Sequence, residues 1–234
     1  MQRLFLLLVL LILASPASAQ PTKTQTTLWY RLYATKPLSQ KLKAGLLIED
    51  RKYLNPWRSH IFLTELNLQR KVARQWTVGI HGTYLIFALP HDPQVRESVR
   101  MDELRTHQSI TFPQIHLKKV GISLRSMVEQ RWFSIEGEDR SMDSYTYTYL
   151  RLRHRLRVRI PLTKRLSCLL SDEYMIQARK DLHFRYDQNR AGVSAMVKVN
   201  DQVALELGYL HWHQRRAALR FSRHSLRTGI YLKL

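Results

Sequence analysis

The chain of 234 residues has little cysteine, few acidic residues and no long apolar run beyond its first twenty positions. Cys168 is the single cysteine, which excludes an internal disulfide and the cysteine-stapled scaffolds of small secreted proteins. After Gln20 no apolar run approaches the length of a transmembrane helix. Long linkers, internal repeats and low-complexity tracts are also missing. We therefore expect one domain without membrane-spanning helices.

The shortage of acidic residues gives the chain a large positive charge. Asp and Glu total 18 against 38 Lys and Arg, for a formal net charge of +20. Such an excess is typical of proteins whose partners are polyanions: nucleic acid, lipopolysaccharide phosphates or anionic lipid head groups.

The start of the chain has the three parts of a secretory signal peptide. Arg3 precedes an apolar run from Leu4 to Leu13, and the small residues Ala17 and Ala19 flank Ser18. The pattern predicts that residues 1–19 are removed and that residues 20–234 form the mature domain. Export argues against a nucleic-acid partner, so lipid phosphates or an anion-attracting interior remain.

The strongest pattern of the mature chain lies between Tyr145 and Pro161, where arginine recurs at every second position. The residues are Arg151, Arg153, Arg155, Arg157 and Arg159. Aliphatic residues stand between them, with His154 as the exception. A period of two places the arginines on one face of an extended strand and the aliphatic residues on the other, whereas a helix would scatter them.

Alternation of apolar and polar residues continues through most of the chain, for example in Lys41–Arg51, Trp76–Ile86 and Leu226–Leu234. We count roughly eleven strands of about ten residues, joined by short turns and longer polar loops, as in a transmembrane antiparallel up-and-down β-barrel. Single-chain bacterial barrels have even strand numbers, so we expect 12 strands, with 10 as the alternative. Pro90–Leu104 is expected to be a loop, and Arg105–Lys118 a strand that Pro113 interrupts.

The cost of burying charge in lipid decides which face of the arginine strand points inward. One arginine at the bilayer midplane costs about 2 to 4 kcal/mol, and five would exceed the typical stability of a domain, about 5 to 15 kcal/mol. The arginines must therefore face the lumen, with acidic residues of neighbouring strands, among them Glu49 and Glu65, as partners. The predicted lumen network is Arg125, Glu129, Arg131, Arg151, Arg153, Arg155, Arg157, Arg159, Glu173, Arg190 and Glu206.

Two further expectations concern the lipid side of the barrel. His154 has the parity of the lipid-facing aliphatic residues. Aromatic residues near strand ends are expected to form the girdles at the two membrane interfaces. These residues are Trp29, Trp76, Trp132, Tyr145, Tyr209 and Trp212.

The sequence resembles a family of Gram-negative outer-membrane β-barrels known as domain of unknown function 2490. The resemblance rests on short motifs along most of the mature chain: Leu28-Trp29, Glu49-Asp50-Arg51, Glu129-Gln130-Arg131, Arg151 to Leu162, Asp172-Glu173-Tyr174, Gln188-Asn189-Arg190 with Gly192, and Leu207-Gly208-Tyr209. It implies a barrel fold and an outer-membrane location in a Gram-negative bacterium. The family has no established activity, so the resemblance implies no catalytic residue.

Several functions fit a basic exported barrel. We favour a structural or interaction barrel, or a narrow channel, whose lumen is filled by arginine–glutamate ion pairs, because small barrels have little free interior. An anion-selective pore or transporter lined by the arginines is the first alternative. The others are an outer-membrane lipid hydrolase, using the serine and histidine of His224-Ser225 or His107-Gln108-Ser109, and a soluble secreted β-sandwich that binds polyanions.

The remaining site predictions concern the partners of the barrel. Outer-membrane lipid and lipopolysaccharide are the expected partners, and basic extracellular residues are expected to contact the lipopolysaccharide phosphates. They are Arg215, Arg216, Arg220 and Arg223. His211 and His213 share one strand face but fall short of the usual number of metal ligands. We expect no cofactor, no metal, no catalytic residue and no nucleic-acid partner.

Overall fold

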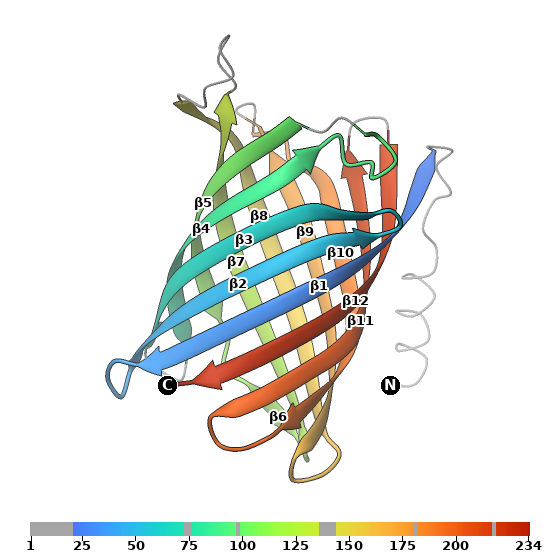
Figure 1. Cartoon of the computed structure of the whole chain (residues 1–234). Helices are drawn as coiled ribbons and strands as arrows, with labels where there is room; N and C mark the ends of the chain where they lie inside the picture. The colour runs from blue at the N-terminus through green and yellow to red at the C-terminus, as the bar shows by residue number, and fades with distance from the viewer. Residues whose placement is uncertain (1–20, 73–75, 97–98, 136–143, 180–181, 217–218) are drawn as a thin grey trace, which may run out of the picture.

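The computed structural model describes residues 21–72, 76–96, 99–135, 144–179, 182–216 and 219–234, whose strands form one closed β-barrel (Figure 1). The strands are β1 (Thr22–Pro37), β2 (Leu42–Leu54), β3 (Trp57–Lys71), β4 (Thr77–Leu89), β5 (Val99–Thr111), β6 (Ile115–Leu117), β7 (Val120–Ile135), β8 (Ser144–Pro161), β9 (Leu166–Ala178), β10 (Arg185–Lys198), β11 (Val203–Arg216) and β12 (Leu219–Lys233). The predicted signal peptide, residues 1–19, lies outside the described residues. No helix in the described part of the chain is long and apolar enough to cross a membrane.

The barrel closes between its first and last strands. Consecutive strands pair antiparallel, and β5 pairs directly with β7, so that the short β6 lies beside β7 at the margin of the sheet. The sheet has the expected 12 strands, of which eleven close the barrel. Because eleven is odd, β1 and β12 run in the same direction and pair in parallel, from Thr22 opposite Arg220 to Thr35 opposite Lys233 (Figure 1).

We call the end at which β1 begins the upper end and the end at which β12 finishes the lower end (Figure 1). Three of the lower turns are built in the same way. The side-chain oxygens of Ser39, Thr163 and Asn200 accept hydrogen bonds from the backbone amides that open the next strand, at 3.1, 3.0 and 2.7 Å. Short polar side chains of this kind fix tight turns by replacing missing backbone partners.

The strand prediction was wrong at one place, between Pro90 and Leu104. The structure begins β5 at Val99, inside the segment expected to be a loop, and ends it at Thr111 before Pro113. The segment looks like a loop in sequence because it is polar. Glu103 is nevertheless 1% exposed, because it points into a charged interior and pairs there with Arg105 and Arg131.

Apolar and charged residues have exchanged the places they take in most soluble domains. The outer face carries strongly exposed aliphatic residues, such as Leu66 (67% exposed) and Ile80 (60%), whereas the buried positions of the interior include Glu129 (0%). His154 is exposed on the outer face, as its parity predicts, and lies 3.0 Å from the Ser126 hydroxyl. The arginines of β8 lie on the opposite, inner face.

The prediction of an aromatic girdle was wrong for two of the tryptophans. Trp29 and Trp212 are almost completely buried inside the barrel and meet edge to face, with ring centroids 5.7 Å apart. The guanidinium of Arg51 lies 3.9 Å above the Trp29 ring, and that of Arg223 lies 4.4 Å above Trp212. Cation–π contact of this kind explains why aromatic rings are suitable inside an arginine-rich lumen.

Candidate functional site

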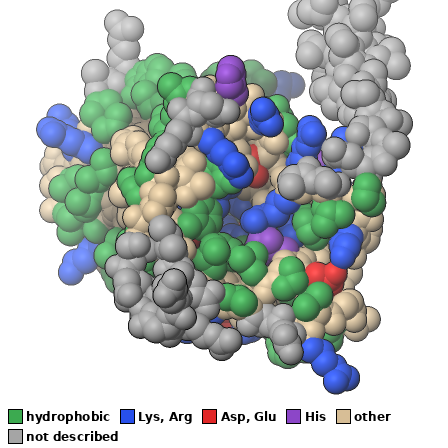
Figure 2. Space-filling model, turned by 90° about the horizontal axis from the view of Figure 1, so that it is seen from above, with side chains coloured by type: hydrophobic (Ala, Val, Ile, Leu, Met, Phe, Trp, Pro, Cys, Tyr) green, Lys and Arg blue, Asp and Glu red, His purple; other side chains and the backbone are tan. Residues whose placement is uncertain are grey.

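The upper part of the interior is filled by an aromatic and aliphatic cluster, which we call the upper plug. Its buried members are Trp29, Ile61, Leu63, Leu85, Phe87, Leu210 and Trp212. The ring of His60 stacks between Tyr53 and Trp212, at 4.3 and 5.6 Å. Viewed from the upper end, Figure 2 shows basic and histidine side chains in the central depression.

A loop after β4 folds over the upper plug. The ring of His91 is buried and stacks on Phe87 at 5.5 Å, while its carbonyl oxygen accepts a hydrogen bond of 2.8 Å from the Gln25 side chain. The neighbouring Asp92 accepts a hydrogen bond of 2.6 Å from the Lys23 ammonium. The loop is thereby attached to the first strand.

Below the plug, arginines and acids from five adjacent strands form a continuous ion-pair network around Glu129. Its carboxylate accepts hydrogen bonds from Arg151 at 2.9 Å and from Arg153 at 2.8 Å. Arg153 also donates to Glu173 at 3.0 Å, so two carboxylates share one guanidinium. Arg151 pairs in addition with Asp187 at 2.9 Å.

The predicted lumen residues fall into three groups. The first group belongs to the ion-pair network and consists of Arg125, Glu129, Arg131, Arg151, Arg153, Glu173 and Arg190. Arg190 lies at the edge of the network, 3.9 Å from Glu173. Glu206 belongs to a separate cluster, where it pairs with Arg227 and accepts a hydrogen bond of 2.6 Å from Ser194. The third group is Arg155, Arg157 and Arg159.

The third group lies towards the lower end and is less well neutralised. Arg159 donates to the Ser167 hydroxyl at 3.2 Å. Among the described residues, neither Arg155 nor Arg157 forms an ion pair with a carboxylate. We call these two residues the lower arginines. Both are only partly exposed, and Glu173, which lies opposite Arg155, already pairs with Arg125 and Arg153, so the lower interior carries an excess of positive charge.

Sequence reasoning missed several members of the network. Glu103, Arg105 and Asp187 are central to it, with Glu103 hydrogen-bonded to Arg105 at 2.7 Å. Glu103 and Arg105 do show the alternation of a strand, but the polar residues before Arg105 are typical of a loop and conceal this signal for Glu103.

The four arginines expected to form one extracellular surface do not do so, and this part of the prediction was wrong. Arg223 is fully buried inside the barrel, where it donates to Gln25 at 2.7 Å and to Gln214 at 2.8 Å. All four arginines lie on strands β11 and β12 rather than on a loop: Arg215, Arg216, Arg220 and Arg223. Among them only Arg215 is exposed. Alternation explains the result, because successive residues of a strand point to opposite faces.

The residues of the histidine pairs found in the sequence have different neighbours in the structure. His224 is exposed on the outer face, whereas Ser225 is buried in the interior against Thr27 at 2.6 Å. His211 contacts the Ser222 hydroxyl at 2.9 Å, and His213 contacts the Tyr186 hydroxyl at 2.8 Å. These side chains therefore have separate partners on neighbouring strands.

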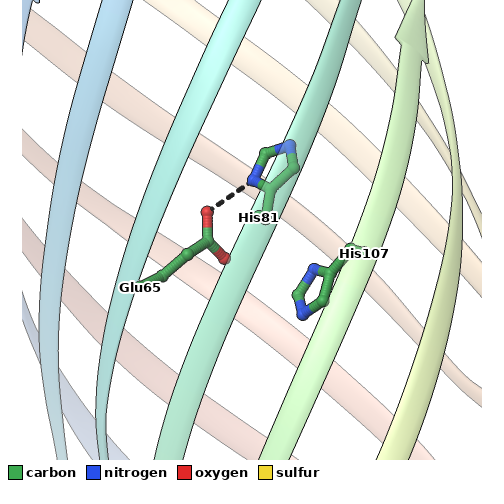
Figure 3. Close-up of side chains that lie close together, drawn as sticks. All are labelled: Glu65, His81 and His107. Carbon is green, nitrogen blue, oxygen red and sulfur yellow. Dashed lines mark hydrogen bonds and ion pairs between the residues drawn. The ribbon is translucent and has the colours of Figure 1, made fainter.

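A different cluster forms on the inner face where β3, β4 and β5 lie side by side (Figure 3). Nδ1 of His81 lies 2.8 Å from a carboxylate oxygen of Glu65, and Nε2 of the same ring lies 2.9 Å from the Ser109 hydroxyl. The ring of His107 stacks on His81 with centroids 5.6 Å apart and contacts the Thr83 hydroxyl at 3.2 Å. The sequence analysis considers Ser109 together with His107, but in the structure the Ser109 hydroxyl contacts His81 instead.

The acid and the two imidazoles of this cluster could also hold a metal ion. Glu65, His81 and His107 each offer one ligand atom, and these atoms lie within 4.8 Å of one another. However, both ring nitrogens of His81 are already engaged by Glu65 and Ser109. The nearby lumen is also rich in guanidinium groups, which repel a cation.

Comparison with known proteins gives one result about this barrel. Residues 26–223 match the model of a family described as protein of unknown function (DUF2490). No curated protein matches the chain. The resemblance drawn from the sequence motifs is thus confirmed, and because the match spans most of the chain, the chain belongs to the DUF2490 family.

Proposed function

We propose that the protein is a closed outer-membrane β-barrel of a Gram-negative bacterium that acts as a structural or interaction barrel. The observation that carries this proposal is the inverted distribution of side chains, with exposed aliphatic residues outside and charged residues inside. A soluble β-sandwich would need an apolar core between two sheets. Here a single sheet closes on itself around ion pairs, which supports lipid as the surrounding medium.

The orientation follows from the connections. Transmembrane barrels have short periplasmic turns, and the lower turns after β1, β8 and β10 are short. The lower end would then face the periplasm. Lipopolysaccharide would meet the upper rim, where Arg215 is exposed.

The interior favours a barrel without steady ion flow over an open anion pore. The upper plug and the loop that carries His91 fill one end of the lumen, and Glu129 and Glu173 hold arginines from several strands below it. An ion crossing the barrel would have to displace both layers.

Planar bilayer recordings of the purified mature protein test the proposal. We expect little steady conductance from the natural protein, and conductance steps when the plug is hollowed by Trp29→Ala with Trp212→Ala. The matched control is Trp132→Ala, because Trp132 lies on the outer face and its removal leaves the lumen filled. Large, stable, anion-selective steps from the natural protein would favour the pore instead. A mature chain that is folded and monodisperse in buffer without detergent would refute the membrane placement.

A further inference from the structure

The contacts of His81 have the arrangement that nucleophilic serine catalysis requires. Its Nε2 lies 2.9 Å from the Ser109 hydroxyl, and its Nδ1 lies 2.8 Å from the Glu65 carboxylate. A histidine between a serine and a carboxylate can remove the serine proton, while the carboxylate holds the ring in the correct tautomer and stabilises the imidazolium. The three residues come from three adjacent strands, so the sheet fixes their positions.

The position beside the serine requires a glycine, Gly79. This glycine is directly opposite Ser109 in the strand register. A Cβ at position 79 would lie 2.7 Å from the Ser109 hydroxyl oxygen and 3.0 Å from Nε2 of His81. Any larger residue would therefore displace the Ser109 hydroxyl or the His81 ring, so glycine at this position keeps the serine–histidine contact intact. Gln69 lies opposite Gly79 on the other side, and its amide donates to Asn67 at 3.0 Å.

We propose that Ser109, His81 and Glu65 form a hydrolytic triad for carboxylic esters inside the barrel. The Ser109 oxygen bonds to the ester carbonyl carbon and transfers its proton to His81. The ester C–O bond then breaks, and the alcohol leaves with the proton from His81. Water, deprotonated by His81, attacks the acyl-serine, which releases the carboxylic acid and restores the serine.

The surroundings indicate that the ester carries a negative charge. Arg125 lies on β7, one diagonal step from the position opposite Ser109, and the lower arginine Arg155 is directly opposite Arg125 on β8. Two strand spacings and a shift of two residues along the strand place the backbone of Arg155 about 12 Å from that of the serine. A carboxylate or phosphate at the far end of the ester would meet this excess positive charge.

The same lower region provides the entrance. The upper plug closes the other end of the lumen, while Ser109, Arg125 and Arg155 are all partly exposed to water. A water-soluble anionic ester can therefore approach from the lower end. Membrane lipids lie outside the barrel wall and cannot reach the serine.

Labelling with a fluorophosphonate tests the triad without knowledge of the natural substrate. The activated serine oxygen bonds to phosphorus and fluoride leaves, and mass spectrometry locates the adduct. We expect labelling of Ser109 in the folded mature protein and loss of labelling in Ser109→Ala and His81→Asn. Ser225→Ala is the matched control, because Ser225 also faces the interior but contacts Thr27 instead of a histidine. Slower migration of each protein after heating confirms that every variant is folded before comparison.

Hydrolysis of two model esters tests the role of each group. With mono-4-nitrophenyl glutarate we expect Ser109→Ala to lower kcat/KM by about 100-fold or more. Glu65→Gln should lower kcat with little change in KM. Removal of the lower arginines by Arg155→Gln with Arg157→Gln should raise KM for this anionic ester and leave the neutral 4-nitrophenyl acetate unaffected.

Three results would overturn the proposal or part of it. Failure of Ser109 to react in the folded protein, with equal hydrolysis by Ser109→Ala, would remove the triad. Loss of hydrolysis on chelation and its return with Zn²⁺ would reassign Glu65, His81 and His107 to a metal centre. Equal KM values with and without the lower arginines would remove the anionic substrate class. The labelling can succeed or fail whether or not the barrel lies in a membrane, so the two proposals are tested separately.

Discussion

The ion-pair network makes a quantitative prediction at Glu129. The substitution Glu129→Gln keeps the size of the side chain and removes its charge. The carboxylate is 0% exposed and accepts hydrogen bonds from Arg151 and Arg153 at 2.9 and 2.8 Å. Arg105 and Arg131 lie 3.7 Å from the same carboxylate oxygen. Four guanidinium groups would lose a common counter-charge.

The expected loss of stability follows from what those arginines retain. Removing one partner of a buried ion pair costs about 3 to 5 kcal/mol, because the other charge remains buried. Arg151 keeps Asp187 at 2.9 Å, and Arg153 keeps Glu173 at 3.0 Å. We therefore expect the lower end of that range, about 3 kcal/mol, in the free energy of unfolding.

Urea titration of the detergent-folded protein measures this loss through tryptophan emission. For a typical denaturant slope of about 1 to 3 kcal/mol per molar, the midpoint should fall by about 1 to 3 M. Asp92→Asn is the control, because its pair with Lys23 is partly exposed and should contribute less than about 1 kcal/mol. A loss for Glu129→Gln no larger than that of the control would refute the reasoning that the network stabilises the fold.

Three further predictions concern the barrel as a whole. Because eleven strands close it, epitope tags after Gln20 and after Leu234 should lie on opposite sides of the membrane, and protease added to intact cells should remove only one. Leu66→Arg, near the middle of the outer face, should destabilise the membrane-folded barrel by about 2 to 4 kcal/mol, and Leu66→Ala by less, in the same urea titration. The hydrogen bond from Lys23 holds the pKa of Asp92 below the ordinary value of 3.8, so the contact between this loop and β1 should be fully present above that pH and be lost as the pH falls through the lowered pKa. Limited proteolysis of the loop at pH 7 and at successively lower pH values below 3.8 should show the difference, and Asp92→Asn should show none.

The sequence predicts the strands and their faces well, because alternation is a local property. The arginines of β8 read as one face of a strand, and the structure places them inside the barrel with Glu129 and Glu173 as partners. The cost of arginine in lipid predicts this inward orientation before any partner is known. The lower turns were predictable for the same reason, since Ser39 and Asn200 act on residues close to them in sequence.

Contacts between strands were harder to predict from the sequence, because the register of each strand depends on the whole sheet. Nothing local shows that Ser109 lies beside His81 rather than acting with His107, two residues away on the same face. The inward tryptophans were missed because an aromatic residue near a strand end fits a girdle equally well. The contact that distinguishes an interior position for Trp29 is the guanidinium of Arg51 over its ring, and this contact joins two different strands.

The acidic residues are distributed unevenly along the lumen. For this reason a filled upper interior and a positively charged lower interior can occur in the same barrel. Glu103, Glu129 and Glu173 neutralise arginines in the upper and central interior, directly below the aromatic cluster. Arg155 and Arg157, on the same strand face, form no ion pair among the described residues, although Arg155 lies opposite Glu173, which already pairs with Arg125 and Arg153. Under the proposed function such a barrel would attract anions at its lower end and block them at the upper plug, so its interior would be better suited to bind an anion than to transmit one. The proposed reactive serine near the lower end is therefore compatible with the proposed absence of steady conductance.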